Sequence, residues 1–196
     1  MKKGYIVLIV IGVLLLIGYM SVKGKYNGMV EKDEGVKTAW SQVENVYQRR
    51  ADLIPNLVKV VKGYAKHEQE TLTGVVEARA KATSVNVSAD NLSPETMNKF
   101  MAAQDGLSSA LSKLMVVVER YPDLKANQNY LELQSQLEGT ENRIATERRA
   151  FINSAKDYNV YIKKFPNNIY AGMFGFEKAA YFEANKGAEK APEIDM

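Results

Sequence analysis

The feature that most constrains this chain is an uncharged apolar segment close to its N-terminus. From Gly4 to Val22 the sequence reads GYIVLIVIGVLLLIGYMSV. As an α-helix, this segment would cover about 28 Å, close to the thickness of the hydrocarbon core of a bilayer. Tyr5 and Tyr19 stand near its ends, where amphipathic rings favour the membrane interface. We therefore predict a transmembrane helix within residues 1–25 that anchors the rest of the chain in the lipid bilayer.

A cleaved signal peptide is the alternative interpretation of this segment. The apolar run is long for a signal peptide, and no small-x-small cleavage site follows it, because the next residues are Met20, Ser21, Val22 and Lys23. The pattern favours a retained anchor and hence a single-pass protein of the cell membrane.

Lysines flank both ends of the anchor, so its orientation is nearly balanced. Lys2 and Lys3 precede it, and Lys23, Lys25 and Lys32 follow it. The short basic N-terminus favours a cytoplasmic N-terminus and a soluble part outside the cytoplasm. The side of the membrane stays open at this point.

The charge and the residue types exclude several classes of function. The chain carries 26 basic and 23 acidic residues, and two of the basic residues are Lys2 and Lys3 before the anchor. The remainder is nearly balanced, so no broad positive field would attract nucleic acid. The absence of cysteine excludes disulfides, thiolate nucleophiles and cysteine-ligated zinc. No phosphate-binding loop or dinucleotide fingerprint is present.

Helical periodicity runs from Tyr26 to about Val85. Val36, Trp40, Val43 and Tyr47 follow one another at spacings of three and four, with polar residues between them. Pro55 lacks an N–H for the preceding turn, so we predict a kink or a break near residues 52–55. From Lys81 to Leu92 the period is lost and polar residues accumulate, which predicts a loop.

Two further long helices are predicted after this loop. Ser93-Pro94-Glu95 is typical of a helix start, and the apolar stripe that follows ends near Tyr121-Pro122-Asp123. The last long helix should extend from Ala126 to Lys164. Its seam repeats every seven residues, through Tyr130, Leu137, Ile144, Phe151 and Tyr158.

The predicted fold class is all-α. We expect an N-terminal transmembrane helix followed by an antiparallel bundle of long helices with a C-terminal aromatic tail. The bundle domain would span residues 26–184, and residues 185–196 form a polar C-terminus that we expect to be flexible. The first bundle helix could be continuous with the anchor.

Catalytic chemistry finds little support in the sequence. His67 is the single histidine, and the motif HEQET lacks the second histidine of a zinc-protease helix. One histidine also cannot supply the two Glu-x-x-His pairs of a di-iron bundle. We therefore predict no catalytic residues, no metal site and no cofactor, with His67 on the surface of a helix.

Arg50 is the first candidate for binding. It lies three residues after Tyr47 and three before Leu53, on the apolar side of its helix. A guanidinium group there needs a carboxylate partner, since an unpaired buried charge is costly. Either Arg50 forms an interhelical ion pair, or it binds an acidic group of a partner. Four carboxylates could pair with it: Glu44, Asp52, Glu141 and Glu147.

The second candidate is the C-terminal tail, where large apolar side chains are crowded. So many rings would not be left in water, so the tail either folds back on the bundle as a strap or docks on a partner. Together with Arg50, the candidate partner-docking residues are Tyr170, Phe174, Phe176, Tyr181 and Phe182.

Three long segments resemble the LemA family of bacterial membrane-anchored helical bundles. They are VKTAWSQVENVYQRRADLIPNLVKVVKGYAKHE, TENRIATERRAFINSAKDYNVYIKKFP and AGMFGFEKAAYFEA, at residues 36–68, 140–166 and 171–184. The resemblance covers nearly the whole chain. It implies a membrane-anchored bundle without an established enzymatic activity, and it suggests a membrane zinc protease as a possible partner.

These observations predict a membrane-anchored, non-catalytic bundle that acts as an interaction or scaffold module. One alternative is an enzyme or regulator that acts with a membrane metalloprotease. Another is a structural protein that self-assembles as a homo-oligomer in the membrane plane. The lipid bilayer is the partner expected in every case, and nucleic acid is not expected in any.

Overall fold

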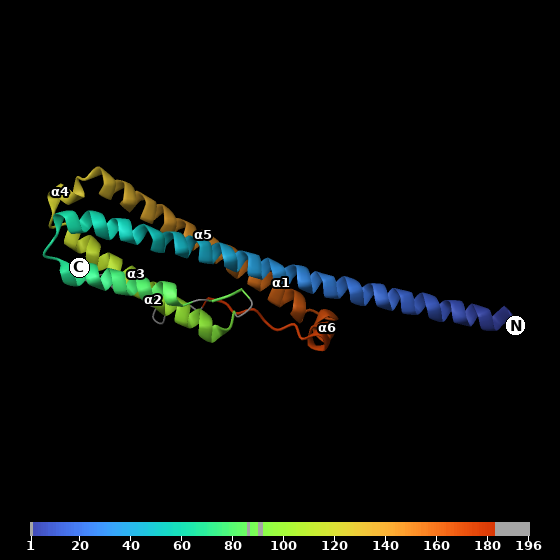
Figure 1. The fold of residues 1–196 in the computed structure, drawn as a ribbon. Coiled ribbons are helices and arrows are strands. Elements are labelled where there is room, and N and C mark those ends of the chain that lie inside the picture. The colour runs from blue at the N-terminus through green and yellow to red at the C-terminus, as the bar shows by residue number, and fades with distance from the viewer. Residues whose placement is uncertain (1, 86, 90–91, 183–196) are drawn as a thin grey trace, which may run out of the picture.

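The computed structural model of the chain describes residues 2–85, 87–89 and 92–182 (Figure 1). Within these ranges the regular structure is entirely helical, as the sequence predicted. Its helices are α1 (Lys2–Tyr64), α2 (Gln69–Ser84), α3 (Pro94–Val118), α4 (Pro122–Lys125), α5 (Gln128–Lys163) and α6 (Asn167–Phe174).

Helix α1 joins the predicted anchor to the bundle without interruption. It has 63 residues, which corresponds to about 95 Å at 1.5 Å per residue. Its N-terminal part projects alone beyond the other helices (Figure 1), and the residues from Gly4 to Ser21 are exposed. The sequence predicted a kink or a break near residues 52–55, and the break is absent because α1 continues through Pro55 to Tyr64.

The actual break in the first helical segment comes later than the sequence predicted. The chain turns between Tyr64 and Gln69, so that the segment predicted as helical up to Val85 forms two helices, α1 and α2. The predicted loop also starts too early, because α2 extends to Ser84.

Helix α3 begins as its sequence predicted and ends earlier. The Ser93 hydroxyl accepts a hydrogen bond from the Thr96 backbone N–H, and the Thr96 hydroxyl accepts one from the Ser93 backbone N–H. This reciprocal capping box satisfies two donors at the helix start. The helix ends at Val118, and Pro122 begins the short α4 where the sequence predicted only a helix end.

Helix α5 runs antiparallel to α1 and is the main packing partner of α1. The five residues of the predicted seam, from Tyr130 to Tyr158, are all buried. The two helices approach closely at Gly28, where the hydroxyl of Tyr161 occupies the space that a Cβ atom at residue 28 would need. Further along, Trp40 packs edge-on against Phe151.

The core consists of two apolar clusters along the bundle. The cluster nearer the projecting part of α1 contains Trp40, Phe100 and Phe151. The distal cluster contains Ile54, Leu114 and Leu137. Arg50 lies in α1 between the two, three residues after Tyr47 and four before Ile54.

Candidate functional site

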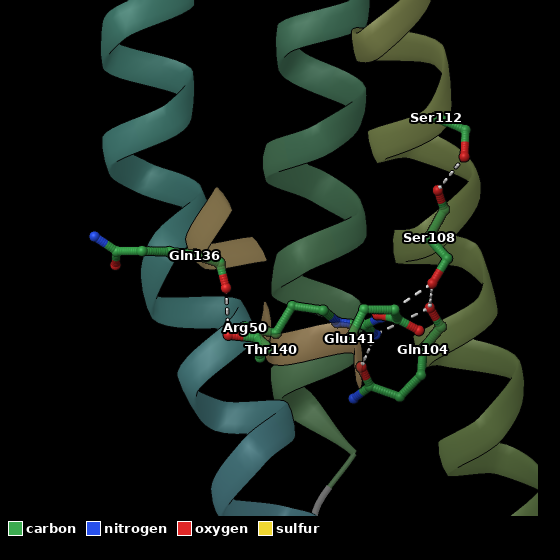
Figure 2. A network of polar contacts seen from close by, with 7 residues as sticks. All are labelled: Arg50, Gln104, Ser108, Ser112, Gln136, Thr140 and Glu141. Atoms are coloured by element: carbon green, nitrogen blue, oxygen red, sulfur yellow. Dashed lines mark hydrogen bonds and ion pairs between the residues drawn. The ribbon is translucent and has the colours of Figure 1, made fainter. Parts of the chain in front are cut away.

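Arg50 is buried in the bundle, with 3% of its surface exposed, and it connects three helices. One terminal nitrogen, Nη1, donates to the Ser108 hydroxyl and the Glu141 carboxylate, each at 3.1 Å. The other, Nη2, donates to the side-chain oxygen of Gln104 at 2.7 Å. Figure 2 shows Arg50 reaching from α1 toward Glu141 of α5 and toward Gln104 and Ser108 of α3.

Among the four carboxylates that the sequence offered, Glu141 is the ion-pair partner of Arg50. The pair is unequal, since the Glu141 side chain is mostly exposed while Arg50 is almost completely covered. Neutral acceptors on α3 therefore solvate much of the buried charge. With its terminal nitrogens engaged in this way, the guanidinium group works as an interhelical tie.

His67 lies in the turn between α1 and α2 and not on a helix, and its side chain is exposed. The neighbouring Glu68 accepts a hydrogen bond from the Tyr121 hydroxyl and pairs with Arg120. In the described part of the chain, no group of three or more histidine, aspartate or glutamate side chains is arranged to hold a metal ion.

The C-terminal segment after α6 returns along the bundle and is tied to α5 by hydrogen bonds. Gly175 ends α6 with φ of 74°, a left-handed conformation that glycine adopts without strain. The Tyr158 hydroxyl then donates to the Glu177 carbonyl at 2.8 Å. Asn159 binds Ala179 twice, through its side-chain N–H₂ and its side-chain oxygen. We call residues 175–182 the strap.

Aromatic rings extend the strap's contact with the first core cluster. Phe182 packs against Trp40 and Phe151, and the Arg148 guanidinium lies over its ring. Phe176 packs edge-on against Tyr26 of α1. The tail thus folds back on the bundle, one of the two alternatives that the sequence left open.

The remaining predicted tail residues are more open to solvent. Phe174 contacts Tyr26 but stays partly exposed, and Tyr181 is exposed next to the half-buried Phe182. Tyr170 is half-buried against the first core cluster. The structure therefore gathers Phe174, Phe176 and Tyr170 at the end of the bundle nearest the anchor. Arg50 lies deeper in the bundle, and the role of all these residues in docking stays a prediction.

A groove of about 520 Å³ opens between α1 and the strap. Its apolar wall contains Tyr26, Val30, Phe174 and Phe176. Charged side chains line the rest, among them Asp33, Glu34, Lys37 and Lys178. The sequence did not indicate this groove, because its two walls are separated by about 150 positions in the chain; Tyr26 was noted only as the start of a helix.

Burial at the strap also changes the acidity of one side chain. Tyr158 lies beneath the strap and is 2% exposed. Burial raises its pKa from 10.0 to about 12, and the nearby Asp33 carboxylate acts in the same direction. Tyr158 is therefore a neutral hydrogen-bond donor at physiological pH.

Known proteins include relatives of this chain. The LemA family model matches residues 39–196. Magnetosome protein MamQ 2 of Paramagnetospirillum magneticum is 31% identical over 206 aligned positions, which cover 95% of this chain and 75% of that protein. Protein LemA of Metamycoplasma hominis is 26% identical, and the alignment covers 88% of this chain and 76% of that protein.

Proposed function

The chain belongs to the LemA family, and we propose that it is a membrane-tethered, non-catalytic interaction module. In this proposal residues 1–25 form the anchor, residues 26–184 form the bundle, and the bundle presents a protein-binding surface close to the bilayer. The chain is membrane-associated, since α1 contains a stretch that is long and apolar enough to cross a bilayer.

The continuity of α1 is the observation that carries the proposal. The same helix contains the exposed apolar stretch and supplies Trp40, Arg50 and Ile54 to the bundle. A bundle joined to its anchor by a helix is held at a defined height and angle, unlike one joined by a flexible linker. That geometry suits a protein that positions a binding surface near a membrane.

We propose the groove between α1 and the strap as this binding surface. Tyr26 and Phe174 expose part of their rings in its wall, and exposed aromatic side chains are typical anchors in protein interfaces. Acidic and basic side chains at the groove would orient the partner. The occupant we propose is a segment of another membrane protein that emerges from the same bilayer.

The membrane zinc protease suggested by the family resemblance is our specific candidate for this partner. The basic N-terminus further leads us to propose that the bundle lies outside the cytoplasm. Both proposals are testable in intact cells without any assumption about an activity.

Site-specific photo-crosslinking in intact membranes tests the proposed surface. A photoreactive residue replaces Tyr181, two residues after the groove-lining Ala179, or Leu131 on α5 near the opposite end of the bundle. Both side chains are 43% exposed, so they are matched for solvent access. We expect Tyr181 to capture a specific membrane protein that Leu131 does not capture.

A second substitution tests whether the captured protein occupies the groove. Tyr26→Ser removes an exposed ring from the groove wall, and we expect it to abolish the adduct formed at residue 181. An adduct that persists in Tyr26→Ser would argue against the groove. Crosslinks only to a second copy of this chain would instead favour self-assembly.

A further inference from the structure

An apolar face without a partner lies on and just before α6. Phe165, Ile169 and Met173 follow one another at intervals of four residues and are 81%, 52% and 70% exposed. The opposite side of α6 is buried, since Asn167 and Ala171 face the bundle. Helix α6 is therefore amphipathic, and its outer face remains uncovered by the described chain.

The antiparallel register of α1 and α5 shows at which level along α1 this apolar face lies. Gly28 lies beside Tyr161, and Arg50 pairs with Glu141. Moving one residue toward the N-terminus of α1 therefore corresponds to moving about one residue toward the C-terminus of α5. On the same register, Phe165 falls at the level of about residue 25 of α1, only about 5 Å beyond Val22, where the uncharged stretch ends.

The far end of α6 lies at the same level. Phe174 packs on Tyr26, with ring centroids 5.0 Å apart. Because both ends of this segment are level with residues 25–28 of α1, α6 lies across the axis of α1. Figure 1 shows α6 at the end of the bundle from which α1 projects. A helix in this position is close to parallel with the membrane plane when α1 spans the bilayer.

The charges around α6 fit an anionic lipid surface. Lys23 and Lys25 on α1 share this level with Lys163 and Lys164 at the end of α5. None of the four has an ion-pair partner among the residues that the structure describes. After the apolar stretch, the first acidic residue of α1 is Glu31, about 9 Å further along the helix from Lys25.

We propose that the outer face of α6 is a second membrane contact, in which Phe165, Ile169 and Met173 enter the interface of the bilayer that α1 spans. Amphipathic helices bind this interface with apolar side chains toward the acyl chains and lysines toward anionic headgroups. The headgroup layer is about 5–8 Å thick on each side, which matches the height of Phe165. This proposal uses only the membrane segment of α1, so it stands or falls separately from the proposed binding groove.

A depth measurement on the full chain in vesicles tests the proposal. The chain has no native cysteine, so a single introduced cysteine carries a nitroxide label at one known position. Met173→Cys probes the α6 face, and Val116→Cys, near the C-terminal end of α3, is the matched control. The two native side chains are 70% and 69% exposed. The vesicles contain phosphatidylcholine with or without phosphatidylglycerol.

The expected result is a difference between the two labels that depends on lipid charge. At residue 173 the ratio of oxygen collisions to nickel-chelate collisions should rise several-fold above the ratio at residue 116. Adding Lys163→Gln and Lys164→Gln should reduce the rise in phosphatidylglycerol vesicles. Circular dichroism should stay unchanged, since all three substituted side chains are exposed.

Two results would overturn the proposal. Equal accessibility at residues 173 and 116 in both lipid mixtures would mean that α6 stands in water. Protection at residue 173 that disappears when the protein is diluted in lipid would mean that a second copy of the chain covers the face.

Discussion

At the scale of single residues, Arg50 shows how this bundle accommodates a buried charge. The guanidinium group lies between two apolar clusters and reaches polar atoms on α3 and α5. Leaving a buried acceptor without a donor costs about 1–3 kcal/mol. Only the Glu141 carboxylate of the ion pair is exposed; water screens its attraction to Arg50, and screened ion pairs contribute about 0–1 kcal/mol. The contribution of Arg50 should therefore come mainly from the buried Gln104 and less from the exposed Glu141.

Two substitutions separate these contributions. Arg50→Met should lower the free energy of unfolding by about 2 kcal/mol, because Gln104 loses its donor. Glu141→Gln should lower it by less than about 1 kcal/mol, because that side chain is mostly exposed. Trp40 is the single tryptophan and is buried in the bundle, so its fluorescence reports denaturant unfolding in mild detergent. Equal losses in the two variants would assign the stability to the ion pair.

Tyr158 predicts a loss of stability at alkaline pH. Its pKa is raised by burial to about 12 in the folded protein, against 10.0 for an exposed tyrosine. Between these values the unfolded chain releases the proton and the folded chain keeps it. The free energy of unfolding should therefore fall as pH rises from 10 to 12, and the contribution of Tyr158 should be complete below pH 10.

Tyr158→Phe tests this pH dependence. The variant loses the hydrogen bond to the Glu177 carbonyl, at a cost of about 1 kcal/mol at neutral pH. Its stability should then fall less steeply above pH 10 than that of the native chain. Unfolding monitored by Trp40 fluorescence at pH 8 and pH 10.5 gives the comparison. An identical pH slope in both proteins would contradict the assignment to Tyr158.

At the scale of elements, α1 passes through Pro55 because another helix replaces the missing donor. Within a helix, the N–H of residue 55 would bind the carbonyl of Ala51. Here the Arg79 side chain of α2 donates its Nε–H to that carbonyl at 2.7 Å. Pro55 itself is on the exposed side of α1. The sequence indicated the missing N–H but not the donor that replaces it, which comes from a residue 28 positions away from Ala51.

This explanation predicts coupling between Arg79 and Pro55. Arg79→Met should cost about 1 kcal/mol in the native background, since the Ala51 carbonyl loses its donor. In the Pro55→Ala background the same change should cost only a few tenths of a kcal/mol, because an alanine at this position supplies the backbone N–H that proline lacks. Denaturant unfolding of the four proteins in this double-mutant cycle measures the coupling. Additive effects would show that the Arg79 contact does not support the helix at Pro55.

The features that could be predicted from the sequence are those that depend on residues close together in the chain. The seven-residue seam from Tyr130 to Tyr158 predicted α5, and Ser93-Pro94 predicted the start of α3; both predictions are confirmed. The turn at residues 65–68 was missed, because it contains neither proline nor glycine. There Ala65 is buried in the distal cluster and Glu68 binds residues 120 and 121. Such contacts exist only in the assembled bundle.

The candidate site could also be predicted only where residues close together in the chain gave a signal. The apolar position of Arg50 in its helix predicted an interhelical ion pair, and Glu141 was among the four carboxylates considered. The crowding of rings predicted that the tail would be covered or docked. The specific partners of the strap, Tyr158 and Asn159, could not be found in this way. Both side chains lie on a face of α5 that the strap covers, and the periodicity of α5 alone does not indicate that a distant segment binds there.

At the scale of the whole molecule, the continuous α1 would join the bundle rigidly to the proposed membrane anchor. From Lys23 to Tyr64 the helix rises about 60 Å at 1.5 Å per residue. The turn that contains His67 should therefore stand about 60 Å above the membrane surface. Helix α6 should stay close to that surface, because it lies at the end of the bundle from which α1 projects (Figure 1). A bundle on a flexible joint would instead sample many orientations and a much lower mean height.

Energy transfer between a labelled cysteine and labelled lipid headgroups measures this height. His67→Cys places the donor in an exposed turn of a chain that has no native cysteine. The expected donor height is about 60 Å, which gives weak transfer. In the control, six glycine and serine residues inserted after Lys23 replace the rigid joint with a flexible one, and transfer should increase. If the native chain gave the same strong transfer as this variant, α1 would bend at the membrane surface. The bundle could not then hold a binding surface at a fixed height.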